Sequence, residues 1–536
     1  MLILKKTGKT ERKDGFMSGV IILSLSTLIV KIIGLAFKIP MLSLLGMEGM
    51  GYFNSAYEIY ALLCVISTAG LPVALSILVS SSLARNDFCG AATAYRSAKR
   101  MFFVFGALGM VFMLFFAKIL AAGIGNEGAF YCITAIAPAL LFICLASAVR
   151  GYCQGFGNMK PTAVSQLIEA LAKLALGVAF AILGIKKGFS IPVISALAVL
   201  GITIGTFFSL CYLLFEKRRL KKSGVPLRLG KGDGRAKELV KIALPITLGS
   251  AIISLTRIVD MTLMMRRLQE IGVSQFRANE IYGAYTTLAL PVFSLIPSLI
   301  TPISMALIPE LTNAIERGSI HGQTETVEKA LRLTSAFSMP AALALTVFSR
   351  QILSLLFQGQ SEAVEIGAPL LSLLGGSVLF SCLITTTNAI LQSYGCVGKP
   401  IFSMSVGVVV KAISSYFLLG TESVGAYGAP IGSLACNVTV VLLNFALMMR
   451  CAKNTQNAIS ISKSFLKPFI ASIFAIGGAY GVFCLFSSVF VSEAVAFVIS
   501  MAVAVMIYAL LAFLLGILTR DDVTALPLLN RLVKQK

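Results

Sequence analysis

Apolar residues occupy runs of roughly 20 positions or more, separated by short polar stretches, from one end of the chain to the other. A run of that length crosses the hydrocarbon core of a bilayer when it is helical. The fourteen runs that we count have approximate limits of 17–40, 57–83, 101–122, 129–149, 161–185, 190–215, 240–265, 281–309, 333–357, 364–390, 401–420, 425–449, 466–490 and 493–518. The pattern predicts an all-α polytopic membrane protein without a soluble domain.

Composition narrows the class of protein further. Of 536 residues, 57% are hydrophobic and 13% are charged, and the mean hydropathy is +0.90. Soluble chains carry about a quarter charged residues, so a water-soluble enzyme is excluded. The first apolar run passes 20 residues, carries Lys31 and lacks a small-residue cleavage site, so we interpret it as the first span and not as a signal peptide. The glycine-rich segment that follows it, 46–51, predicts a flexible outer turn.

The basic residues predict the orientation of the chain. Lys and Arg number 45 against 23 Asp and Glu, which gives a formal net charge of +22. With the N-terminus inside, alternate loops hold 33 of the 45, Arg150 among them, and the opposite loops hold eight, including Lys38. Such a bias places both termini in the cytoplasm. The excess positive charge therefore sets topology, and we expect no nucleic-acid partner.

Two stretches of the chain resemble one another. Gln154–Pro161 and Gln392–Pro400 share Gln-x-aromatic-Gly and Lys-Pro, and each is followed by a lysine within a span, Lys173 and Lys411. Lys31 in the first span likewise falls opposite Arg257 in the seventh, at an offset of 226 residues. A parallel repeat is a transporter architecture with the substrate site between the halves. The alternative is a chance likeness between hydrophobic helices.

The repeat divides the chain into four parts. We expect an N-terminal six-helix lobe at 1–222, a cytoplasmic linker at 223–240, a C-terminal six-helix lobe at 241–455, and two extra helices with a cytoplasmic tail at 456–536. The linker is assigned because the segment is rich in basic residues and glycine.

Four basic residues lie within the predicted spans, where each costs roughly 2.5–3.5 kcal/mol to insert. We predict that Lys31, Arg257, Lys173 and Lys411 line a central cavity and bind an anion such as a diphosphate, to which Lys and Arg supply donors and charge. Glu169 lies four residues before Lys173 and Asp260 three after Arg257. These acidic residues are either structural ion-pair partners or cavity ligands, and both interpretations stay open. Buried acid–base pairs also suit a cation-coupled carrier.

Other chemistry is absent from the sequence. It has one histidine, His321, with no companion ligands at metal spacing, and no Walker loop. We therefore expect a protein that is not an enzyme and needs no cofactor. A lipid-linked sugar transferase is the remaining enzyme class, although no predicted outer loop is long enough for its catalytic group.

Several segments resemble a known superfamily. The Lys31–Gly34 turn, Gly49–Tyr57, Ser67–Pro72 and Arg150–Glu169 are similar to the multidrug/oligosaccharidyl-lipid/polysaccharide flippase superfamily. Within it the chain looks most similar to the stage V sporulation protein B and polysaccharide biosynthesis branch, which is related to MurJ-type lipid II flippases. The resemblance covers essentially the whole chain, and 150–169 is its most specific part.

The resemblance implies a V-shaped protein of fourteen helices with two six-helix lobes. We expect it to be a monomer in a bacterial plasma membrane. The resemblance also implies that spans one, two, seven and eight line the cavity and that spans thirteen and fourteen form a groove for a polyprenyl tail. The implied activity is alternating-access translocation of an undecaprenyl-diphosphate-linked cell-wall precursor, with a cation-coupled multidrug exporter as the alternative. Lys31 matches the basic residue of span one in lipid II flippases. Tyr285–Pro291 departs from their pattern because it lacks the arginine of span eight.

Overall fold

The computed structural model describes residues 9–85, 87–222, 235–396, 398–451, 462–487 and 492–517. Within these ranges the chain is helical with short turns and contains no strand. This confirms the all-α fold expected from the apolar runs.

Thirteen helical stretches of the described chain are long and apolar enough to cross a membrane. The first, Ser26–Ala84, has 59 residues, which is enough for two crossings of about 20 residues each. With two crossings in the first stretch and one in each of the others, the helices accommodate the fourteen predicted spans. The protein is a multi-pass membrane protein.

Helix α1 (Lys9–Thr68) contains the first of these spans and part of the second. Its only interruption is at Gly46, whose φ of 67° and ψ of −177° are not helical. Only glycine adopts this region without strain, because it has no Cβ. The predicted flexible turn at 46–51 is thus wrong in extent: one residue bends the chain, and the helix resumes directly after it.

Contacts between Cα atoms divide the chain into two compact units, Met1–Thr287 and Leu288–Lys536. The first unit holds α1 and seven further helices, listed in chain order: α2 (Gly70–Ala84), α3 (Phe88–Gly123), α4 (Ala129–Gly155), α5 (Lys160–Lys186), α6 (Ile191–Lys222), α7 (Arg235–Glu270) and α8 (Gln275–Ala284).

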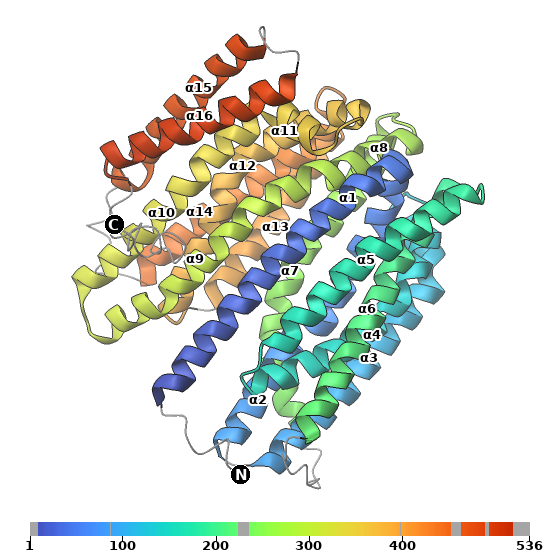
Figure 1. Ribbon diagram of the computed structural model, residues 1–536, viewed down its shortest axis with the longest axis vertical. Helices are drawn as coiled ribbons and strands as arrows, with labels where there is room; N and C mark the ends of the chain where they lie inside the picture. The colour runs from blue at the N-terminus through green and yellow to red at the C-terminus, as the bar shows by residue number, and fades with distance from the viewer. Residues whose placement is uncertain are drawn as a thin grey trace. The chain divides into compact units, whose positions relative to one another are not determined.

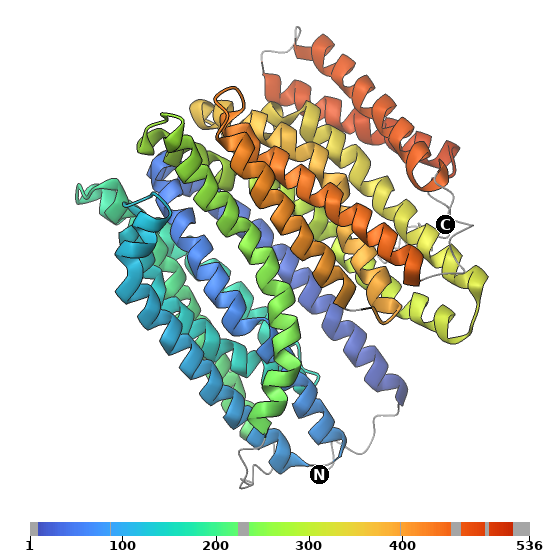
Figure 2. The ribbon, with the colours of Figure 1, turned by 180° about the vertical axis from the view of Figure 1, so that it is seen from behind.

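Helix α4 packs against α1, α2, α3 and α6, and it lies next to α3 and α6 in Figure 1. Its buried positions are mostly Ala, Gly, Ser and Cys. Small residues let backbones approach closely, which is how helices associate in lipid. Seen from behind, α7 runs beside α2 (Figure 2).

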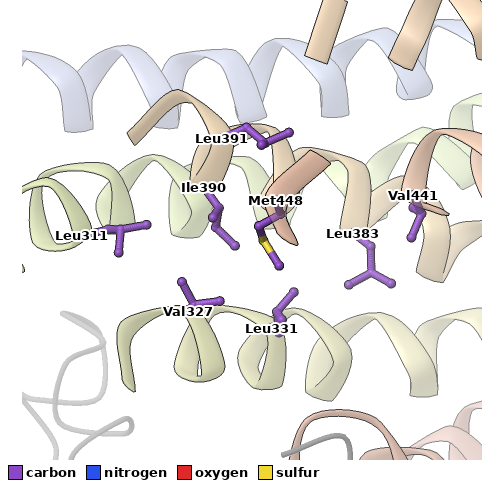
Figure 3. Close-up of a cluster of buried hydrophobic side chains, with 8 residues drawn as sticks. All are labelled: Leu311, Val327, Leu331, Leu383, Ile390, Leu391, Val441 and Met448. Carbon is purple, nitrogen blue, oxygen red and sulfur yellow. The ribbon is translucent and has the colours of Figure 1, made fainter. Parts of the chain in front are cut away.

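The second unit begins within the π-helical turn η1 (Tyr285–Ala289). Its helices are α9 (Leu290–Glu316), α10 (Ile320–Val347), α11 (Ser349–Leu356), α12 (Ser361–Ser393), α13 (Gly398–Leu419), α14 (Gly428–Cys451), α15 (Lys467–Ser487) and α16 (Glu493–Leu514), with short turns η2 (Gly425–Tyr427) and η4 (Ser462–Leu466). A buried apolar cluster from α9, α10, α12 and α14 forms part of its core: Leu311, Val327, Leu331, Leu383, Ile390, Leu391, Val441 and Met448 (Figure 3).

The contact-based division falls inside the eighth predicted span, not at the predicted linker. Helices α7 and α8 belong to the first unit because they pack on α1 and α2. Residues 223–234, which make up most of the predicted linker, lie outside the described residues. The four-part division of the chain by repeats stays a prediction.

The two resembling stretches end their helices in the same way. At the end of α4, the Asn158 N–H donates to the Cys153 carbonyl and Gly157 has a φ of 77°. At the end of α12, the Cys396 N–H donates to the Leu391 carbonyl and Gly395 has a φ of 75°. Both are Schellman motifs, in which glycine supplies the left-handed residue. The sequence likeness therefore corresponds to a shared backbone conformation.

Candidate functional site

Six ionisable side chains of the first unit, contributed by three helices, interact electrostatically with one another. We call them the charge cluster: Lys31, Lys38 and Glu58 on α1, Lys173 on α5, and Arg257 and Asp260 on α7. Four are basic and two are acidic, so the cluster is positive when all six are ionised. All six lie in helical stretches long enough to span a membrane.

Lys31 and Arg257 are the exposed members of the charge cluster. Each lies in the electrostatic field of the other. An Arg257 nitrogen lies 3.8 Å from a Glu58 carboxylate oxygen, while half of the Arg257 side chain remains accessible. The structure thus brings together the two residues that the repeat paired at an offset of 226, and both are exposed.

Lys38 is anchored by the π-helical turn at the unit boundary. Its Nζ donates to the Thr286 carbonyl. In a π-helix this carbonyl would pair with the N–H five residues on, but residue 291 is proline and has none. The lysine supplies the missing donor. Lys38 also lies in the field of Lys173, Glu58 and Arg257, which joins it to the charge cluster.

Lys173 is surrounded by aromatic rings of α1. Its Nζ lies 4.7 Å from the ring centroid of Phe37, 5.1 Å from Tyr57 and 5.7 Å from Phe53. Ammonium groups within about 6 Å of a ring face are attracted by the ring quadrupole. Because Phe37 precedes the bend at Gly46 and the other two rings follow it, Lys173 contacts both arms of α1.

Glu169 forms an ion pair with Arg150 on α4 at 3.0 Å, and it also lies in the electrostatic field of Lys173 one turn away. Arg150 also donates to the hydroxyls of Ser165 and Ser209, at 3.0 Å each. The pair joins α4, α5 and α6. Arg150 lies within α4, which continues to Gly155, and not in a loop; its predicted place at the inner side of the membrane stays a prediction.

Asp260 is buried on α7, one turn after Arg257, and interacts electrostatically with Glu58. The acidic side of the charge cluster therefore comprises Glu58 and Asp260. Glu58, which has no charged partner near it in the sequence, pairs with a helix remote in sequence.

Lys411 lies on α13 of the second unit and is buried, with 7% of its surface exposed. Eight residues before it on α13, Ser403 donates to Asn444, and Asn444 donates to Thr387 at 2.9 Å and to Asn388 at 2.9 Å. These contacts join α12, α13 and α14, as the Arg150 contacts join α4, α5 and α6. Asn388 and Asn444 are thus interhelical hydrogen-bond partners.

A second polar network in the first unit is uncharged, and we call it the Asn126 network. Asn126, in the turn between α3 and α4, donates to Ser55 at 3.0 Å and to Asn279 at 2.8 Å. Asn279 on α8 donates to the Glu48 carbonyl at 2.8 Å. Ser55, Asn126 and Asn279 are each at least 99% buried. The network ties α8 to α1 and to the start of α4.

Sequence reasoning missed Lys38 and Arg150 because both were counted as loop residues. One signal would have found Lys38: it lies seven residues after Lys31, which puts both on the same face of a helix. No comparable signal existed for Arg150, since its partners lie on other helices. In chemical terms, the charge cluster can bind an anion at its exposed end, where Lys31 and Arg257 offer several donors.

The model of the family described as "polysaccharide biosynthesis protein" matches residues 16–314, which is more than half of the chain. The chain belongs to this family. A second model, described as MatE, matches residues 245–417. The family and its relatives place the protein in the flippase superfamily that the sequence resembles, which confirms that prediction.

Two curated relatives from Bacillus subtilis (strain 168) align over nearly their full length with this family member. Stage V sporulation protein B is 25% identical, over 97% of this chain and 99% of that protein. The lipid II flippase MurJ is 25% identical, over 94% and 96%.

Solved structures share the fold. A lipid II flippase MurJ in an inward closed conformation superposes with a TM-score of 0.70, at 16% identity, covering 92% of this chain and 98% of that one. An inward-facing multidrug resistance MATE family transporter has a TM-score of 0.64, at 16% identity, covering 80% and 99%.

Proposed function

We propose that this protein is a flippase that moves an undecaprenyl-diphosphate-linked cell-wall precursor, lipid II or a related lipid-linked oligosaccharide, across the plasma membrane. The observation that carries the proposal is the charge cluster on α1, α5 and α7. Basic side chains are expensive within a membrane and need a functional reason. A diphosphate headgroup that crosses the membrane supplies one.

The chemistry of the exposed end fits a diphosphate. Arginine binds phosphate oxygens with two parallel N–H donors, and lysine adds a compact positive charge. Arg257 and Lys31 are exposed. The ion pair between Arg257 and Glu58 is long, at 3.8 Å, so guanidinium donors remain accessible to a phosphate. A diphosphate would compete with Glu58 for Arg257, so binding and release would exchange one anionic partner for another.

The remaining predicted site residues lie at different places. Lys173 is held among aromatic rings, Asp260 is buried, and Glu169 pairs with Arg150. We assign headgroup contact first to Lys31 and Arg257, and propose that Lys173 and Lys411 become available to the substrate when the helices around them rearrange.

The relatives support this substrate class. One curated relative is named a lipid II flippase and another a stage V sporulation protein, and both align over nearly the whole chain. Substrate translocation by alternating access is the mechanism that a repeat of helical lobes provides. We propose that the protein acts as a monomer and that its termini face the cytoplasm.

The decisive experiment is rescue of a bacterium depleted of its lipid II flippase. The wild-type chain should restore growth, whereas Lys31→Ala and Arg257→Ala should fail or restore it poorly at equal protein level. The matched control is Lys187→Ala, which removes one positive charge from an exposed position at the end of α5. Full rescue by both cluster variants would overturn the proposed role of the cluster.

A cation-coupled multidrug exporter is the second candidate, because the MatE model matches 245–417 and MATE transporters share the fold. The largely buried Glu58 and the buried Asp260 would then bind the cation. The two candidates differ in what stabilises the purified protein against heat. Lipid-linked precursor should protect a flippase, and cationic dyes should protect an exporter; protection by dyes alone would exclude our proposal.

A further inference from the structure

Two cysteines and a lysine of the second unit meet where α12, α13 and α14 end or begin. Cys396 follows α12, Lys399 lies in the first turn of α13, and Cys451 is the last residue of α14. The Sγ atoms of Cys396 and Cys451 are 2.8 Å apart, and Lys399 Nζ lies 2.9 Å from Cys451 Sγ. All three side chains are partly exposed.

The backbone fixes the position of Cys396. The Schellman motif that ends α12 binds its N–H to the Leu391 carbonyl, and the Lys399 N–H donates to the Cys396 carbonyl. The corresponding position in the first unit is Asn158, so the cysteine is particular to the second copy of the motif. The thiol is therefore held in place and not carried on a freely moving loop.

We propose that Cys396, Lys399 and Cys451 form a redox-active dithiol site that reacts with peroxide-class oxidants. We assign Cys451 as the nucleophile because Lys399 Nζ donates to its sulfur at 2.9 Å, and cysteines beside a basic side chain are the reactive ones in proteins. Cys396 is the resolving thiol.

The reaction balances with hydrogen peroxide as the two-electron oxidant. The Cys451 thiolate attacks one peroxide oxygen, the O–O bond breaks, and sulfenic acid and hydroxide form. The Cys396 sulfur then attacks the Cys451 sulfur, the S–O bond breaks, and the released hydroxide leaves with the Cys396 proton as water. A disulfide of about 2.05 Å replaces the 2.8 Å contact, so the sulfurs need to move by less than about 1 Å.

The surroundings favour these roles. The hydrogen bond to Cys451 raises the pKa of Cys396, which keeps that thiol protonated until it resolves the sulfenic acid. Several other cysteines, such as Cys132 and Cys382, are buried, and burial keeps oxidants away from a thiol. The positive-inside pattern places this site at the cytoplasmic face, where small oxidants and thiol reductants have access.

The test is oxidation of the full-length protein in detergent with hydrogen peroxide and a metal chelator, followed by maleimide blocking, digestion and mass spectrometry. We expect a peptide pair linked through Cys396 and Cys451, reversed by dithiothreitol. Cys396→Ser should stop the reaction at a sulfenic acid on Cys451 that a dimedone-type probe traps. Lys399→Gln should slow formation of the linked pair severalfold.

The matched control is Cys484→Ser, which removes an exposed cysteine from α15 and should leave the linked pair unchanged. Thermal unfolding of each variant, measured before oxidation, should match the wild type, which separates lost chemistry from lost structure. Oxidation confined to the exposed Cys211 and Cys484, with Cys396 and Cys451 still open to maleimide, would overturn the site. An unchanged rate in Lys399→Gln would overturn the role of the lysine.

Discussion

Arg150 is a charge within a membrane-spanning helix that other helices satisfy. It donates to Glu169, Ser165 and Ser209, and 11% of its side chain is exposed. Removing one partner of a buried ion pair leaves an uncompensated charge, at a cost of about 3 kcal/mol or more. We therefore expect Arg150→Ala to lower the thermal stability of the purified protein markedly.

The measurement for this prediction is the fraction that remains monodisperse by size exclusion after heating, since the chain has no tryptophan for fluorescence. The control is Arg219→Ala. Arg219 forms an ion pair with Glu216, and its side chain is 74% exposed. Surface pairs contribute about 0–1 kcal/mol, so that variant should be close to wild type. Equal loss in both variants would contradict the structural role of Arg150.

For Lys173, unlike Arg150, the free-energy cost of burying the charge exceeds the gain from its contacts. Cation–π contacts contribute about 2 kcal/mol when desolvated, whereas moving an ammonium out of water costs several kcal/mol. Methionine would suit the ring cage of Phe37, Phe53 and Tyr57 through sulfur–aromatic contacts. We expect Lys173→Met to keep or raise the melting temperature while it impairs rescue of a flippase-depleted strain. If Lys173→Met is destabilised but still rescues the depleted strain, the role of Lys173 is structural and it does not contact the substrate.

At the scale of single residues, the sequence predicted which charges are unusual but not what they contact. Lys31 and Arg257 stood out because lysine and arginine are rare within apolar runs, and the structure brings them together. Glu169 was matched with Lys173 by helical spacing, whereas its ion pair is with α4. Helical periodicity describes neighbours on one helix, so partners on other helices are invisible to it.

At the scale of elements, α1 depends on one glycine. The backbone of Gly46 lies in a region that costs other residues about 1–3 kcal/mol. A Cβ at this position would meet no atom within 4 Å, so the cost of a side chain is backbone strain alone. Gly46→Ala should therefore destabilise the protein by about that amount or straighten α1, and thermal unfolding in detergent should detect the loss.

Gly34 offers a matched control for Gly46. It lies in the same helix with helical backbone, and a Cβ there would also meet no atom within 4 Å. Alanine favours a helix over glycine by up to about 1 kcal/mol, so Gly34→Ala should be neutral or stabilising. If both variants lose the same stability, the backbone conformation at Gly46 is not the reason that glycine is required there.

The spans themselves were predictable because a bilayer imposes a length and an apolar composition on every helix that crosses it. The position of the bend was not. The segment 46–51 holds three glycines, and hydropathy gives no reason to choose Gly46 over Gly49 or Gly51. The π-helical turn before Pro291 was also unpredictable, although the proline marks where a helix must change its hydrogen bonds.

At the scale of the whole molecule, the repeat predicts lobes, but it does not predict which helices pack together in one conformational state. Helices α7 and α8 lie in the predicted C-terminal lobe, yet they pack in the unit that also holds α1 to α6. The Asn126 network is part of this packing, because it joins α8 to α1 and to the turn before α4. Under the proposed alternating access, we expect these contacts to break and reform in each cycle.

The Asn126 network therefore makes a prediction about the population of opened states. Asn126→Ala leaves buried partners unsatisfied, which costs about 1–3 kcal/mol, and each 1.4 kcal/mol changes an equilibrium about tenfold. Hydrogen exchange of residues 270–287 should accelerate by about tenfold or more. Asn437→Ala is the control, because it removes a 2.7 Å bond to Ser377 within the second unit and should leave exchange at 270–287 unchanged. Unaltered exchange in both variants would show that the network does not hold α8 in place. The hydrogen bond from Lys38 on α1 to the Thr286 carbonyl, in the π-helical turn that follows α8, would then be the contact to test next.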